Sequence, residues 1–188
     1  MFKGIIAEAA CKVEVIDKLD GWKDTTPPGQ HVYDFRVQRG QHSVTIQTKL
    51  QRSEGGETLR ATKGGLYDPE QFVVETQKTR GGEKNGKATR PYYFGEFDIL
   101  AVAMKPSTGS WADFRFTVER WLVPRTDDRR LIAVYQPVSL KPNEDWTDDL
   151  KTAIRWLKSD VKKTIRGAGA KPRAVSKKKS GISLFGDE

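Results

Sequence analysis

Three polar residues are spaced so that a pair of strands would bring them together. Asp34 lies at the start of a run that alternates apolar and polar residues, and Gln47 and Lys49 lie in a second such run. Carboxylate and amide oxygens are suitable ligands for a hard divalent cation such as Mg²⁺. A lysine beside that ion could position a water molecule or stabilise the charge that develops on an attacked phosphate ester. The three residues therefore suggest metal-assisted hydrolysis.

A β-hairpin is the element that must position these residues. Residues 33–37 and 44–50 both alternate with a period of two, and a turn-forming sequence, 39–42, lies between them. A loop centred on Gly40 and Gln41 pairs residues whose numbers sum to 81. The spacing therefore predicts an antiparallel pair with a defined register.

The apolar pattern selects this register. Phe35 faces Ile46, and one face of the hairpin is wholly apolar. On the other face Asp34 lies opposite Gln47, with Lys49 two residues further along. A shift by one residue would place Phe35 against a polar side chain, which would break the apolar face.

Glu8 is a fourth candidate, carried by a predicted helix over residues 3–19. Apolar residues recur there at helical spacing: Ile5, Ala9, Val13 and Ile16. Glu8 lies off this stripe. It is either an acidic ligand that joins Asp34 at the ion or a solvated surface glutamate.

The candidates stand in three short motifs: Lys3-Gly4-x-x-Ala7-Glu8, Tyr33-Asp34-Phe35-x-Val37 and Val44-x-Ile46-Gln47-x-Lys49. Together they resemble the PD-(D/E)XK nuclease superfamily, in the branch with a Gln-x-Lys variant of the half-motif. Archaeal Holliday-junction resolvases and many restriction endonucleases belong to this broad group. The resemblance covers roughly residues 3–52. It implies an α/β (α+β) fold with a restriction-endonuclease-like mixed central β-sheet flanked by helices.

The remaining elements agree with that fold class. Strands are predicted at residues 72–76, 97–103, 114–118 and 131–138. A closing helix is predicted from apolar residues at helical spacing: Trp146, Leu150, Ile154, Leu157 and Val161.

The resemblance also implies a role for each candidate. Asp34 would be the central metal ligand, Glu8 the helix-borne acid and Lys49 the catalytic lysine. Gln47 stands where most members have an acidic ligand. Its amide oxygen can ligate a metal or orient a water molecule but brings no negative charge, so we expect weaker metal binding, or one cation where others use two. The implied cofactor is Mg²⁺, with Mn²⁺ as a substitute.

A metal-dependent DNA endonuclease is the activity that the resemblance implies, in restriction and defence or in DNA repair and recombination. We expect a homodimer, because cutting two strands with one site per chain requires two copies. A second class is a catalytically inactive nuclease fold that serves as the DNA-binding subunit of a larger complex, and Gln47 favours it. A third class is a small structural protein.

Positive charge is concentrated at the end of the chain. The 188 residues include 33 Lys and Arg and 25 Asp and Glu, a net charge of +8. Residues 162–188 contain eight basic and two acidic residues, so residues 1–161 carry only +2. We therefore expect a nuclease-like domain at 1–161 and a flexible basic tail at 162–188. The tail either neutralises DNA phosphates or keeps the chain in solution.

Basic residues at strand ends and in the tail are candidates for contacts to DNA phosphates, or are simply solvated charges: Arg52, Lys78, Arg80, Lys177, Lys178 and Lys179. Near the end of the chain, Ile182-Ser183-Leu184-Phe185 resembles the short peptide by which bacterial proteins dock on the replicative sliding clamp. Docking of Ile182–Phe185 on such a clamp is a further hypothesis.

Several classes of protein are excluded by composition. One cysteine and two histidines exclude a disulfide framework and a zinc finger. A GxxxxGK[ST] motif is missing, so ATP hydrolysis is not indicated. The sequence contains no run near the roughly 18 apolar residues of a membrane span and does not begin as a secretory signal does. We expect a cytoplasmic protein without a membrane partner.

Overall fold

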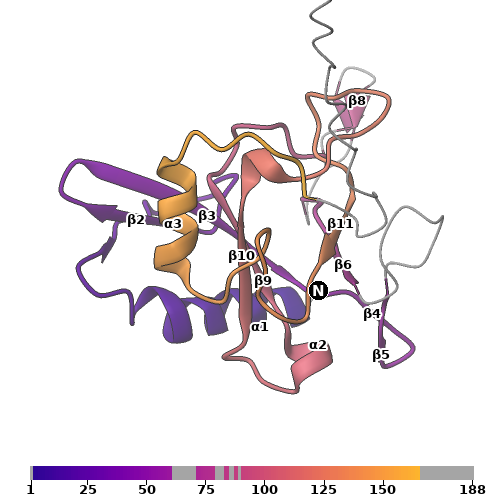
Figure 1. The fold of residues 1–188 in the computed structure, drawn as a ribbon, viewed down its shortest axis with the longest axis horizontal. Helices are drawn as coiled ribbons and strands as arrows, with labels where there is room; N and C mark the ends of the chain where they lie inside the picture. The colour runs from indigo at the N-terminus through magenta and orange to yellow at the C-terminus, as the bar shows by residue number, and fades with distance from the viewer. Residues whose placement is uncertain (1, 61–70, 79–82, 85–86, 89, 166–188) are drawn as a thin grey trace, which may run out of the picture.

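The computed structural model describes residues 2–60, 71–78, 83–84, 87–88 and 90–165. Its centre is a mixed five-stranded sheet in the order β1-β2-β3-β9-β10 (Figure 1). β3 and β9 are parallel, and the other neighbours are antiparallel. The strands are β1 (Lys23–Asp24), β2 (Phe35–Arg39), β3 (His42–Leu50), β9 (Ile99–Ala103) and β10 (Phe114–Val118). The predicted fold class, a mixed central sheet flanked by helices, is confirmed.

The β2–β3 hairpin has the register that the sequence predicts. Phe35 pairs with Ile46, and Gly40 and Gln41 form the two-residue turn. Gly40 has a φ of 59°, in the left-handed region that glycine adopts without a Cβ clash. Turn and apolar pattern thus specify the same pairing.

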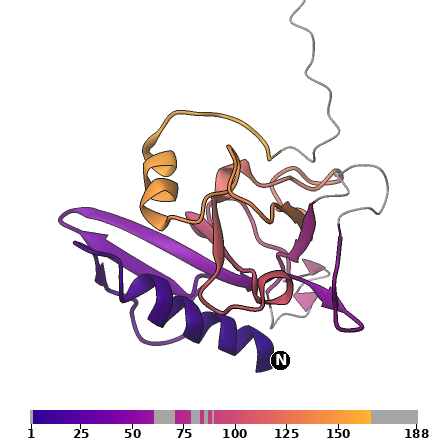
Figure 2. The same ribbon diagram turned by 60° about the horizontal axis from the view of Figure 1, so that its bottom comes forward.

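The sheet separates two apolar cores. On one face, α1 (Phe2–Cys11) packs on β3, and α3 (Leu150–Lys158) packs on β10. Figure 2 shows α1 alongside the hairpin. The other core is closed by an antiparallel pair, β6 (Phe72–Glu75) and β11 (Tyr135–Val138). Alternate residues of β9 belong to different cores, which explains its continuous apolar run.

Short elements complete the described part of the chain: η1 (Lys12–Ile16), β4 (Ser53–Glu54), β5 (Glu57–Thr58), β7 (Glu83–Lys84), β8 (Lys87–Ala88), α2 (Lys105–Thr108) and η2 (Glu119–Trp121). The first of these, η1, continues α1 as a single π-helical turn. None of the helices in the described ranges has the length and apolar character that a membrane span requires.

The closing helix begins later than its periodicity predicts. The carboxylate of Asp149 accepts hydrogen bonds from the amides of Lys151 and Thr152 at 3.1 and 3.0 Å, so it caps a helix that starts at Leu150. Trp146 keeps the helical spacing but is buried in the preceding loop. The strand expected at 131–138 is likewise limited to β11.

α1 packs on the sheet with a different face from the stripe seen in the sequence. Ala7 and Cys11 are buried, whereas Ile5 and Val13 are 59% and 56% exposed. Small side chains on the inner face let the helix lie close to β3. Of the stripe, Ile16 alone is buried.

The chain packs on the core beyond the boundary expected after Val161. Ile165 is buried, and its amide donates to the carbonyl of Trp121 at 2.6 Å. The ammonium of Lys163 lies 4.2 Å from the centre of a Trp121 ring and 2.8 Å from the carboxylate of Asp145. Residues 162–165 therefore belong with the folded part. The remainder of the expected tail, which includes Lys177, Lys178, Lys179 and Ile182–Phe185, lies outside the described residues.

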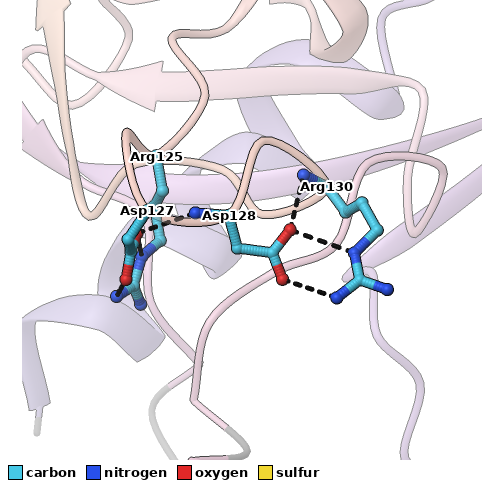
Figure 3. Close-up of polar contacts among 4 residues, drawn as sticks. All are labelled: Arg125, Asp127, Asp128 and Arg130. Carbon is cyan, nitrogen blue, oxygen red and sulfur yellow. Dashed lines mark hydrogen bonds and ion pairs between the residues drawn. The ribbon is translucent and has the colours of Figure 1, made fainter.

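The loop between η2 and β11 carries two side-on arginine–carboxylate pairs (Figure 3). Arg125 donates to Asp127 at 2.8 and 2.5 Å, and Arg130 donates to Asp128 at 3.0 and 2.8 Å. The hydrogen bonds from Arg130 lower the pKa of Asp128 to about 2. Pairs this exposed to solvent contribute little to stability.

Gly40→Ala should lower the free energy of unfolding by about 1–2 kcal/mol, because a Cβ in the left-handed region crowds the following carbonyl oxygen. Gly4 is the matched control, since a Cβ there has open space around it. Gly4→Ala in α1 should raise the free energy of unfolding by up to about 1 kcal/mol through helix propensity. Urea unfolding measures both, and a stabilising effect at Gly40 would contradict the turn.

Candidate active site

Asp34 occupies the point where β3 loses its antiparallel partner. Its own amide donates to the carbonyl of Ile46 at 3.0 Å, just before β2 begins at Phe35. Further along β3, the amide of Thr48 donates to the Asp34 carboxylate at 2.7 Å, where a continuing strand would present a carbonyl oxygen. The carboxylate is therefore held against β3 by the bond that replaces the ladder.

Gln47 lies beside this carboxylate and is buried. Its amide nitrogen donates to Oδ2 of Asp34 at 2.6 Å and to the carbonyl of Thr48 at 3.2 Å. A carboxylate can only accept, so the nitrogen of Gln47 must face Asp34. Both amide hydrogens are thereby used within the chain, and the side chain offers a ligand only its oxygen.

Lys49 lies two residues further along the same strand face. Its ammonium donates to the carbonyl of Gln77 at 2.9 Å. Burial lowers the pKa of Lys49, while the negative charges of three carboxylates oppose this shift: Asp34, Glu8 and Glu75. The ammonium is therefore a partly buried cation among acidic groups.

Glu8 reaches the same region from α1 and is half-buried. Burial raises its pKa, the charge of Asp34 raises it further, and Lys49 acts in the opposite direction. Cys11, one turn further along α1, lies behind the site, and burial raises the pKa of its thiol to about 12. α1 thus brings Glu8 close enough for its charge to act on Asp34 and Lys49.

The donor set fits a single hard cation better than a preformed metal cage. No group of three or more His, Cys, Asp and Glu side chains in the described ranges could hold a metal ion. Burial raises the pKa of Asp34, and the pKa of the neighbouring Glu8 is raised as well. Mg²⁺ commonly binds through one or two carboxylates and completes its shell with water and substrate phosphates. Asp34 and Glu8 are the two carboxylates that could hold such an ion, and the oxygen of Gln47 is a further candidate ligand.

Tyr92 is the residue that the sequence did not reveal. Its ring is buried, with the ammonium groups of Lys49 and Lys78 at 5.3 and 5.2 Å from the ring centre. Phe97 packs edge-on against it at 5.3 Å and 84°, which holds the ring orientation. Burial and the charges of Asp34 and other acids raise the pKa of Tyr92, so the phenol stays neutral. The sequence of residues 91–94 shows no pattern that indicates that Tyr92 contacts Lys49.

Two of the basic residues expected to contact DNA flank the site, and each is paired with an acid. Arg52 contacts the Glu75 carboxylate at 2.5 Å, and Lys78 contacts the Glu96 carboxylate at 2.7 Å. Their charges are therefore largely neutralised within the protein. Arg80 lies outside the described residues.

Comparison with known proteins identifies no family and finds a weak similarity to solved structures. No protein-family model and no curated protein matches this chain. Among solved structures, it is similar to the bacterial homing endonuclease I-Ssp6803I, with a TM-score of 0.43 and 19% identical residues. The similarity covers 76% of this chain and 78% of that chain. At this level, no residue role is transferred.

Replacing Asp34 should change stability in a pH-dependent way. A raised carboxyl pKa means that the folded chain holds the proton more tightly than the unfolded chain. The corresponding stability is present at low pH and is lost as the pH rises through the raised pKa. Asp34→Asn should therefore gain stability relative to the wild type as the pH rises above the ordinary carboxyl pKa of about 4. Thermal unfolding across this range measures the difference.

Asp24 provides a control of opposite sign. Burial acts to raise its pKa, but hydrogen bonds from Thr26 and the charge of Lys12 outweigh burial and lower it. Stability from Asp24 is lost as the pH falls, so Asp24→Asn should lose stability relative to the wild type as the pH rises. If the stability of both variants, relative to the wild type, changed in the same direction with pH, then burial would not be what shifts the pKa of Asp34.

Proposed function

We propose that this chain is a metal-dependent DNA endonuclease of the PD-(D/E)XK type. The observation that carries the proposal is the constellation at the end of the hairpin. Asp34 and Gln47 are joined by a 2.6 Å hydrogen bond, and the ammonium of Lys49 is surrounded by the charges of Asp34 and Glu8. This arrangement supports the proposal, although Gln47 stands where most members of the superfamily have an acidic ligand.

Asp34 and Glu8 would hold the divalent ion, and the oxygen of Gln47 would complete or orient its shell. When bound, the ion would act as a Lewis acid toward a substrate phosphate. Oδ2 of Asp34 already accepts two hydrogen bonds, so Oδ1 is the atom with the greater capacity for a ligand. The carboxylate is thus oriented before any ligand arrives.

Lys49 would stabilise the negative charge that develops on the phosphate in the transition state. An ammonium group has three hydrogens, and one is used on the carbonyl of Gln77. The ring of Tyr92 covers a second direction. Those two contacts restrict the direction in which the remaining hydrogen of the ammonium can point. They also fix the position of the ammonium beforehand, so it need not reorganise during the reaction.

DNA as substrate is supported by the charge distribution. The net charge of +8 comes mainly from residues 162–188, while the site itself is rich in acids. We therefore propose that affinity comes from basic residues outside the site, including Arg80 and Lys177–Lys179, while the site contributes chemistry. Restriction and defence is the proposed setting, with repair or recombination as the alternative.

A catalytically inactive DNA-binding subunit is the second candidate. Gln47 contributes no charge where most members of the superfamily have a carboxylate, and the described residues contain no three-acid cluster. Two carboxylates bind Mg²⁺ only weakly without substrate phosphate. Measured cleavage distinguishes the two candidates.

Asp34→Ala and Lys49→Ala should each reduce Mg²⁺-dependent cleavage of supercoiled plasmid by at least about 100-fold, because the first removes a ligand of the ion and the second removes the cation that stabilises the transition state. DNA affinity should change little, since contacts elsewhere supply it. Asp20→Ala and Lys141→Ala, at exposed positions, are the matched controls and should cut normally.

Unchanged cutting by both site variants would mean that the active-site assignment is wrong. A wild-type chain that binds DNA without cutting it in Mg²⁺ or Mn²⁺ would favour the binding subunit.

Tyr92→Leu should lower the single-turnover cleavage rate about tenfold with little change in DNA affinity, because Lys49 loses the ring face that holds it. Tyr92→Phe keeps that face and should retain most of the rate. An upfield ring-current shift of the Lys49 side-chain protons in the NMR spectrum should be present in the Phe variant and missing in the Leu variant. A rate that is equal in both variants would exclude this positioning role.

A further inference from the structure

The outer face of α1 is apolar, which is unusual for the solvent side of a helix. Ile5, Ile6 and Val13 are 59%, 45% and 56% exposed, and Ala9 between them is exposed too. Single exposed apolar residues are common, but these four recur at helical spacing over three successive turns of α1 and η1, and clustered exposed apolar residues mark interaction sites. We call these four residues the α1 outer face.

Geometry places this face opposite the sheet. At about 100° per residue, Ile5, Ile6 and Ala9 lie on one side of α1, and the buried Ala7 and Cys11 lie on the other. Val13, in the π-helical turn that continues α1, is exposed as well. No contact within the described chain covers the outer face, as the exposed fractions show. A partner with a matching apolar surface would bury it.

We propose that the α1 outer face is the interface of a homodimer, in which two copies of α1 pack antiparallel about a two-fold axis at Ala9. In such a pair, residues that meet have numbers that sum to about 18, so Ile5 contacts Val13 of the second copy. The small side chain of Ala9 lets the two helices approach closely at the centre. An isologous contact needs a self-complementary patch of this kind.

Charge at the border of the patch favours a second copy as the occupant. Lys3 and Glu14 lie on the same flank of α1 and η1, near opposite ends. The antiparallel pairing therefore brings Lys3 of each copy beside Glu14 of the other, which gives two complementary contacts. Glu14 is bound to Lys18 within the monomer at 2.5 Å. An exposed pair of this type is weak enough to share its carboxylate.

The symmetry has a consequence for the proposed site. A two-fold axis perpendicular to both helices keeps corresponding flanks on the same side of the pair. The flank that carries Glu8 would then lie on one side in both copies, so two sites would face one DNA duplex. This consequence rests on the proposed nuclease function, whereas the dimer itself does not.

A contact through one helix is smaller than a standard interface of roughly 1,600 Å². We therefore expect a dissociable dimer, with a Kd on the order of micromolar. Sedimentation velocity of the full chain from about 1 to about 300 µM, without DNA or metal, should show the monomer–dimer transition.

Val13→Asp should abolish the dimer over the same range, because it places a charge against Ile5 of the second copy. Val161→Asp is the matched control: Val161 is 50% exposed on another part of the surface, so this variant should dimerise normally. Circular dichroism and thermal unfolding check that both variants fold. A wild-type chain that stays monomeric, or a Val13→Asp chain that still dimerises, would overturn the proposal.

A charge exchange tests the antiparallel register. Lys3→Glu and Glu14→Lys alone should each raise the dimer Kd about fivefold, because like charges then meet across the interface. The double variant Lys3→Glu/Glu14→Lys should restore the wild-type Kd. A double variant that is weaker than either single one would overturn the pairing. These experiments measure association alone, so their result does not depend on whether the chain cleaves DNA. If the chain dimerised but a separate assay found no cleavage, only the proposed function would be refuted.

Discussion

The hydrogen bond between the Thr48 amide and the Asp34 carboxylate is the interaction on which the site depends. β2 no longer flanks β3 at Thr48, so the amide of Thr48 has no strand carbonyl to donate to on that side. Asp34 meets this need with a side chain, so a ligand-binding group is held by the same bond that satisfies the backbone. The adjoining Gln47 uses its nitrogen on the same oxygen and is oriented by it.

Burial then sets the electrostatics of the region. Asp34 and Lys49 both lose solvent on the inner part of the sheet, and each is held away from its ordinary ionisation behaviour. Opposite charges nearby offset only part of that penalty. A site of this type is less stable than an apolar replacement would be, which is the usual relation between binding groups and the fold that carries them. Burial, and then the charge of Asp34, also raise the pKa of Glu8.

α1 serves two surfaces at once. Its inner face uses small side chains to approach β3, which brings Glu8 within range of the hairpin, and its outer face leaves large apolar residues in solvent. Those requirements are compatible because the residues alternate around the helix. The same helix would therefore connect the chemistry of one chain to its pairing with another, if the proposed dimer forms.

Local pattern was sufficient to determine the hairpin. Period-two alternation and a glycine turn leave only one register with an apolar face, and the structure has that register, with Asp34 beside Gln47. The apolar stripe in the sequence predicted the wrong buried face of α1. This helix is apolar on both sides, and periodicity cannot decide which side packs on the sheet. Tyr92 and the carbonyl of Gln77 could not be predicted either. They reach Lys49 from segments far along the chain, and such contacts depend on how the two cores pack rather than on any neighbouring residue.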